Sequence, residues 1–197
     1  EHCDILIEDG KIKEVGPNLC AENAEVIDAT GKVIIPGIID AHSHIGTFNI
    51  MSNAQDCNEM TNPSKPDLDI YYGIDPDNMS FKHCLRDGTT TSVIAPGSGN
   101  AIGGLVLAMK SAGKDYDSRI VSKPCALKAA VGINPKGAYG SREQFPMSRI
   151  GVAQLFIDFF ENVKDYMNKN GYKFSTAIDE KRFNNYNENM TVNIERK

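Results

Sequence analysis

The sequence is short of basic clusters and of long apolar runs, and each shortage argues against a class of partner. Its 197 residues carry 21 Lys and Arg against 26 Asp and Glu, giving a net charge of −5 and a pI near 5.4. This charge, without any Lys/Arg cluster, argues against nucleic acid as a partner. No apolar run approaches the roughly 18–20 residues that a membrane span needs, so we expect no membrane partner either.

The cysteines lack the spacing of a metal site or of a disulfide framework. The five of them are widely spread, odd in number and without a CxxC pair: Cys3, Cys20, Cys57, Cys84 and Cys125. This pattern suits reduced thiols better than disulfides or a thiolate zinc site. Together with the lack of a signal-peptide pattern at the N-terminus, it predicts a cytoplasmic protein.

Apolar content is ample, because 41% of the residues are hydrophobic. The chain is therefore expected to form one large domain or two small ones. Residues 4–16 show a hairpin pattern around an Asp-Gly turn, and 26–35 show a second one around a Thr-Gly turn. These segments predict a small antiparallel sheet that ends at Pro36-Gly37, which marks a domain boundary.

Beyond Gly37, strand-like and helix-like segments alternate, which favours a parallel α/β architecture. We expect strands at 38–45 and 89–95, helices at about 77–86 and 148–170, and weaker strands at 119–122 and 190–194. Residues 126–131 fit either a short helix or the end of a strand. The long stretch 46–76, rich in Asn, Pro and Asp, is either a lid or substrate wall or a solvated insertion.

Two histidines at the end of the first strand are the leading candidates for chemistry. In a strand, His42 and His44 share one face with Asp40, because side chains alternate with a period of two. Buried imidazoles need hydrogen-bond partners, and a divalent metal would suit the pair because neutral imidazole is the commonest protein ligand of such metals. The spacing alone allows either a metal-binding pair or a polar strand end with chance histidines.

The surrounding segments resemble the start of the amidohydrolase superfamily, most closely its imidazolonepropionase-related members. The resemblance is carried by residues 4–12 (DILIEDGKI) and 26–44 (VIDATGKVIIPGIIDAHSH), and more loosely by 87–104 (DGTTTSVIAPGSGNAIGG). It implies a partial (β/α)8 TIM-type barrel preceded by a small β-sandwich sheet. Residues 1–36 would be the N-terminal part of the sandwich, and 37–197 the first part of the metal-dependent hydrolase barrel.

The resemblance also implies a chemistry and a cofactor. Family members bind one or two divalent metal ions, usually zinc, and His42 and His44 would be first-strand ligands, with Asp40 supporting them. The metal activates a water that attacks a C–N bond, typically of a cyclic amide or peptide-like small molecule. We therefore expect a small-molecule substrate and a metal-dependent hydrolase. Because a partial barrel exposes unpaired strand edges, we also expect a homo-oligomer.

Part of the family's site cannot be assigned in this sequence. No histidine follows His83, and residues 37–197 are fewer than the roughly 250 residues of a complete barrel. We expect the general-base Asp beyond Lys197, so no catalytic residue is assigned and the 197 residues alone should be inactive. An alternative is a non-catalytic, amidohydrolase-like scaffold or oligomerisation protein.

The bridging ligand of the metals has one weak candidate. Lys128 is either a carbamylated metal ligand or an exposed helical lysine, and the second is the commoner role of such a residue. The family often carries Glu at the position of Ile133, so a Glu-bridged centre is in doubt here. In the glycine-rich loop 97–104, backbone N–H groups can cradle an anionic group, and Ser98 and Asn100 are candidate substrate contacts.

Overall fold

The computed structural model describes residues 3–48 and 55–172, and the chain divides into two compact units, Glu1–Pro36 and Gly37–Lys197. In the first unit, β1 (Asp4–Glu8) and β2 (Lys11–Gly16) form the predicted antiparallel hairpin. Its turn places Asp9 and Gly10 at φ values of 51° and 71°, the left-handed region that tight hairpin turns require.

The second predicted hairpin of this unit keeps its turn but not its strands. Lys32 N–H donates to the Ala29 carbonyl at 2.9 Å, yet neither 26–29 nor 32–35 is a strand. Val26 and Val33 are each 87% exposed. An isolated strand pair is only marginally stable without a third strand or a helix to pack against. The apolar pattern of 26–29 and 32–35 is therefore not enough to form strands there.

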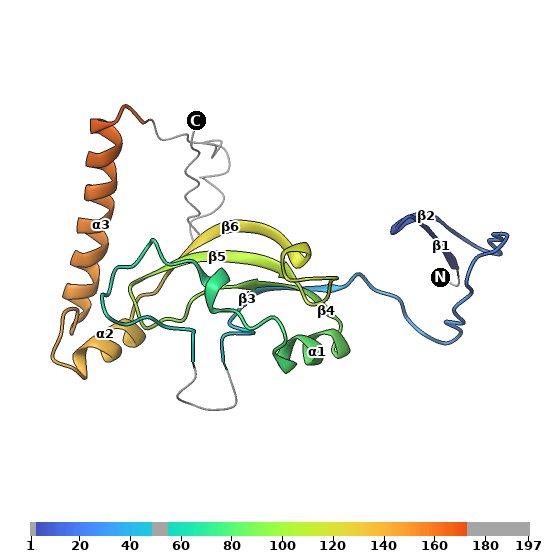
Figure 1. Cartoon of the computed structure of the whole chain (residues 1–197), viewed down its shortest axis with the longest axis horizontal. Coiled ribbons are helices and arrows are strands. Elements are labelled where there is room, and N and C mark those ends of the chain that lie inside the picture. Colours follow the sequence, from blue (N-terminus) through green and yellow to red (C-terminus); the bar gives the residue numbers. More distant parts are fainter. Residues whose placement is uncertain (1–2, 49–54, 173–197) are drawn as a thin grey trace. The chain divides into compact units, whose positions relative to one another are not determined.

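The second unit is built on a four-stranded sheet in the order β3-β4-β5-β6 (Figure 1). The strands are β3 (Ile38–Ser43), β4 (Thr89–Ile94), β5 (Ile102–Lys110) and β6 (Ile120–Ala129). Only β3 and β4 are parallel, whereas β4-β5 and β5-β6 are antiparallel. The prediction of a parallel sheet is therefore wrong for two of its three strand pairs. The 95–101 connection is too short for the crossover of a dozen or more residues that a parallel pair needs.

Two of the three α-helices follow the sequence prediction. α1 (Met79–Arg86) begins at Asn78, whose side chain accepts from Ser80 N–H, and α3 (Arg149–Lys169) begins at Ser148. α2 (Ile133–Gly140) was not predicted, because it contains both Pro135 and Gly137. Residues 126–129 belong to β6, so the helical alternative for them is wrong. None of the helices in the described part of the chain is long and apolar enough to cross a membrane.

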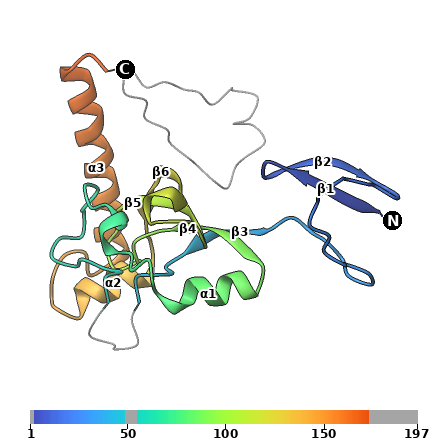
Figure 2. The ribbon, with the colours of Figure 1, turned by 45° about the vertical axis from the view of Figure 1, so that its right-hand side comes forward.

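The helices cover different parts of the sheet. α1 packs against β4, whereas α3 lies where β5 begins (Figure 2), with Leu155 packed against Ala101 and Ile102. On α3, Ile150 lies on the exposed face and is 82% exposed, whereas Leu155 is 7% exposed. The predicted strand at 190–194 lies outside the described residues.

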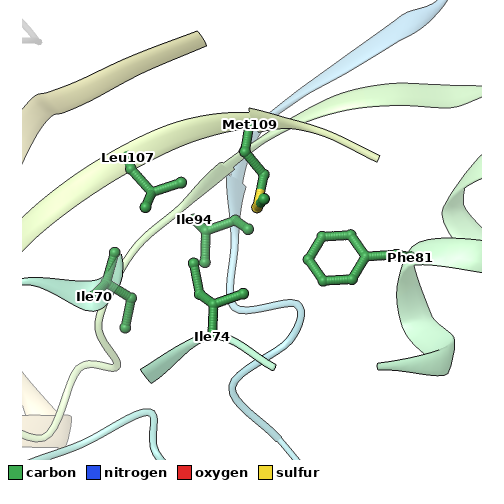
Figure 3. Packing of buried hydrophobic residues seen from close by; sticks show 6 residues of the cluster. All are labelled: Ile70, Ile74, Phe81, Ile94, Leu107 and Met109. Carbon is green, nitrogen blue, oxygen red and sulfur yellow. The ribbon is translucent and has the colours of Figure 1, made fainter. Parts of the chain in front are cut away.

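The main hydrophobic core lies between the sheet, α1 and the short 3-10 helix η1 (Ile70–Gly73) (Figure 3). Its buried members are Ile70, Ile74, Phe81, Ile94, Leu107 and Met109. A second 3-10 helix, η2 (Asp117–Arg119), supplies a buried guanidinium to this region. Arg119 is 7% exposed, stacks 4.2 Å from the centre of the Phe81 ring, and donates to three backbone carbonyls.

The segment 55–76 lies along β5 instead of forming a separate insertion. β4 pairs only with residues 107–110 of β5, which leaves the edge of residues 102–105 open. There, Ile102 N–H donates to the Pro63 carbonyl at 3.1 Å and Leu105 N–H to the Leu68 carbonyl at 2.6 Å. The segment 55–76 therefore occupies the edge of β5 that β4 leaves unpaired.

Candidate active site

The two candidate histidines lie where β3 ends. Their ring centroids are 5.1 Å apart in an edge-to-face arrangement, as expected for residues on one face of a strand. The Asp40 carboxylate accepts from the backbone N–H of His42 at 3.1 Å. Thr47 donates through both its N–H and its hydroxyl to the His44 carbonyl, at 3.2 and 2.6 Å, so the turn after the strand is fixed.

The orientation of the His44 ring is set from β4. Its Nδ1 donates to the backbone carbonyl of Ala95, the residue after β4, at 2.7 Å. Because a carbonyl can only accept, the proton lies on Nδ1 and the lone pair of the neutral ring lies on Nε2. A hydrogen bond of this type is the usual support of a metal-binding histidine.

Lys128 comes to the same place from β6. It is 9% exposed, and its Nζ lies 3.0 Å from His42 Nε2. The interpretation of Lys128 as an exposed helical lysine is therefore wrong. The strand ladder to β5 overrides the helix-like local sequence, and Gly103 leaves space for the lysine, since a β-carbon there would lie 3.0 Å from Lys128 Cγ.

The pKa values of His42 and Lys128 are both lowered, which favours the neutral form of each side chain. The Lys128 charge first, then burial and His44, lower the pKa of His42, against a smaller opposing effect of Asp40. Burial lowers the pKa of Lys128, opposed by Cys57. A neutral imidazole and a neutral amine are the forms that bind metals and react with electrophiles.

A cavity of about 360 Å³ adjoins His44. Within residues 3–48 and 55–172, its lining consists of His44, Phe48, Cys57, Asn58, Gly97, Ser98, Gly99 and Asn134, none of which carries a carboxylate, an ammonium or a guanidinium group. Ser98 is one of these lining residues, and its role as a substrate contact stays a prediction. Phe48, Cys57, Asn58 and Asn134 were not predicted, and only the position of 46–76 after the first strand pointed toward the first three.

The wall of this cavity is formed by residues 57–60 packed on 97–99. Gly97 N–H donates to the Cys57 carbonyl at 2.7 Å, and Gly99 N–H donates to Asn58 Oδ1 at 2.8 Å. A β-carbon at Gly97 would overlap the Asn58 amide, and one at Gly99 would lie 2.6 Å from Met60 Sδ. Glycine is needed here because the wall packs directly on the backbone. Residues 57–60 therefore lie against the 97–99 backbone, and the substrate-wall interpretation of 46–76 stays a prediction.

Asn100 has another role than the predicted substrate contact. It is 3% exposed and lies outside the cavity lining. Its Nδ2 donates to the Glu59 carbonyl, and its Oδ1 accepts from the Tyr139 hydroxyl, so both ends of the amide are engaged. Ile133, where the resembled family often has Glu, begins α2 and is 76% exposed.

The residues present fit part of a metal centre. His44 Nε2, His42 Nε2 and Lys128 Nζ are nitrogen donors, and the last two converge to 3.0 Å. Among residues 3–48 and 55–172, no group of three or more His, Cys, Asp or Glu side chains is arranged to hold a metal ion. A complete coordination sphere would therefore need Lys128, or its carbamate, and donors beyond this set.

Comparisons with known proteins place these features in context. No family model matches the chain. It is 31% identical over 186 residues to the amidohydrolase tasK of Hapsidospora irregularis, covering 84% of this chain and 19% of that protein. It is 55% identical over 42 residues to a dihydroorotase of Bacillus cytotoxicus, covering 21% of this chain and 10% of that protein.

A solved structure extends the similarity to the fold. The crystal structure of an amidohydrolase from Thermotoga maritima matches with a TM-score of 0.80 and 38% sequence identity. The match covers 87% of this chain and 47% of that one. The chain thus spans less than half the length of each of these relatives.

Proposed function

Because the chain belongs to the amidohydrolase superfamily, we propose that its protein is a metal-dependent hydrolase of C–N bonds. Its substrate would be a cyclic amide or a peptide-like small molecule. The observation that carries this proposal is the convergence of His42 and Lys128, at 3.0 Å, beside the oriented ring of His44. The names of the relatives, amidohydrolase and dihydroorotase, support the same reaction class. The β-sandwich and (β/α)8 barrel implied by the resemblance stay a proposal, which the parallel β3-β4 pair supports and the antiparallel β5 and β6 do not.

His42 and His44 would hold the metal ion through Nε2, and Lys128 would reach it as a carbamate. The neutral Lys128 amine adds to carbon dioxide, forming an N–C bond and releasing one proton, which turns a nitrogen donor into a carboxylate. A divalent ion, with zinc favoured by imidazole ligands, would supply Lewis acidity and lower the pKa of water. The Ala95 carbonyl holds His44 in the tautomer that this role needs.

The cavity lining favours a neutral polar substrate group. Asn58, Ser98 and Asn134 offer amide and hydroxyl groups, and Phe48 offers an apolar ring. Amides suit such a lining because they both donate and accept hydrogen bonds. Among the residues that the structure describes, the cavity lining offers no lysine or arginine side chain to a phosphate or carboxylate.

The test uses the intact protein purified from zinc-supplemented medium. Metal content is measured by elemental analysis, and hydrolysis is assayed on dihydroorotate, hydantoin, dihydrouracil and a set of N-acyl amino acids. We expect bound metal and turnover of at least one amide. An intact protein that stays metal-free and hydrolyses none of them would refute the proposal.

Lys128→Met tests the ligand assignment directly. It should lower metal content and abolish turnover, while Lys110→Met, on exposed β5 surface, should change neither. Incorporation of isotope-labelled bicarbonate into the wild type, lost in Lys128→Met, would identify the carbamate. Unchanged metal content in Lys128→Met would remove Lys128 from the site.

A further inference from the structure

Two residues outside the cavity lining, Tyr139 and Asn100, tie together the elements that form its wall. Tyr139 on α2 is 1% exposed, and its hydroxyl donates to Asn100 Oδ1 at 2.7 Å. Asn100 in turn donates to the Glu59 carbonyl at 2.7 Å. A buried chain of hydrogen bonds therefore runs from α2 through the glycine-rich loop to the segment that carries Cys57 and Asn58.

A second contact from α2 acts on the same segment. Arg142, which follows α2, donates from Nη1 to the Met60 carbonyl at 3.0 Å. Its guanidinium also lies 4.8 Å from the centre of the Tyr139 ring. The carbonyls of Glu59 and Met60 are thus both held from α2, one through a buried tyrosine and one through an exposed arginine.

We propose that Tyr139 is a positioning residue for the cavity, acting through Asn100 on the wall formed by residues 57–60. It touches no reacting group itself. Loss of its hydroxyl leaves Asn100 Oδ1 without its donor in a buried site, which weakens the restraint on Glu59. The wall then opens more often, and Asn58 spends less time at the cavity surface where a substrate would meet it.

Cys57 reports this opening without any assay of activity. Its thiol belongs to the wall and is 2% exposed, and burial raises its pKa, so alkylation in the closed state is slow. Iodoacetamide labelling of the intact protein, quantified at the Cys57 peptide by mass spectrometry, should be about five- to tenfold faster in Tyr139→Phe. That factor is the equivalent of one net hydrogen bond.

Tyr116→Phe is the matched control. It removes another tyrosine hydroxyl bond, 2.6 Å to the Tyr71 carbonyl, at the main core. It should leave the Cys57 labelling rate unchanged. An unchanged rate in Tyr139→Phe, or an equal rise in both variants, would overturn the proposal. If Tyr139→Phe does not fold, Asn100→Asp decides in the same assay, because it keeps the acceptor for Tyr139 and loses the donor to Glu59.

The kinetic consequence rests on the proposed function. With the best amide substrate of the panel, Tyr139→Phe should raise KM about fivefold and leave kcat nearly unchanged, since the wall binds and does not react. A fall in kcat at constant KM would contradict the positioning role. If no amide is hydrolysed, the proposed function fails while Cys57 labelling still decides the role of Tyr139.

Discussion

Arg119→Met removes the most heavily bonded charged side chain of the core region. The guanidinium donates to the carbonyls of Lys110 at 3.0 Å, Pro76 at 2.8 Å and Ser111 at 3.3 Å, and it stacks on Phe81. Methionine fills similar space but satisfies none of the three carbonyls. At about 1 kcal/mol for each lost bond and about 1 kcal/mol for the cation–π contact, we expect a loss of roughly 4 kcal/mol.

Such a loss is a large share of the 5–15 kcal/mol by which domains are typically stable. Urea unfolding of the intact protein, followed by far-UV circular dichroism because the chain has no Trp, measures it. Arg119→Lys keeps the charge and one bond, so it should lose about 2 kcal/mol. Exposed Arg86→Met should change stability by less than about 1 kcal/mol. Equal, small effects of Arg119→Met and Arg86→Met would refute the reasoning.

Three further predictions address other parts of the second unit. Gly97→Ala should destabilise the protein by about 1–3 kcal/mol and weaken substrate binding, because its β-carbon overlaps Asn58; wild-type-like urea unfolding and KM would contradict this. Burial raises the pKa of Tyr116 to about 12, whereas an unfolded tyrosine ionises near 10, so the unfolded state loses its proton first. Stability should therefore fall as pH rises from about 10 to 12, by roughly 1–2 kcal/mol after allowing for partial solvent screening, and Tyr116→Phe should flatten that slope in pH-dependent urea titrations. Ser148→Ala should cost about 1 kcal/mol in the same unfolding assay, because the Ser148 hydroxyl accepts from Gly151 N–H at 3.2 Å, whereas Ser148→Asp should keep most of the stability.

Local signals predicted those elements whose ends are fixed by local chemistry. Asn78 and Ser148 cap helices, and Gly88 and Gly171 follow those helices at positive φ, so both helices were found from the sequence. Strand direction was not predictable in this way. The apolar run after Gly104 gives the same pattern in either direction, and only the short 95–101 connection makes β5 antiparallel to β4.

In the candidate site, too, the residues predictable from the sequence are those placed by local spacing. His42 and His44 were predicted because their spacing and a strand period of two place both on one face. Lys128 reaches His42 through the β5-β6 register, which a local sequence with helical propensity does not reveal. Asn100 was assigned to substrate because polar residues in glycine-rich loops often bind ligands, whereas its partner Tyr139 comes from α2, an element that Pro135 and Gly137 concealed.

The bond from His44 to the Ala95 carbonyl and the bond from Gly97 N–H to the cavity wall lie on adjacent peptide units, so the proposed binding of an ion and of a substrate would share this short stretch of backbone. Ala95 directly follows β4, and two residues later Gly97 donates to the Cys57 carbonyl in the cavity wall. A ligand that shifts this backbone also turns the imidazole. Thermodynamic linkage then requires that an ion on His44 and a molecule on the wall change each other's affinity by the same factor. Titrating the intact protein with zinc, with and without an amide ligand, would measure that factor from either side.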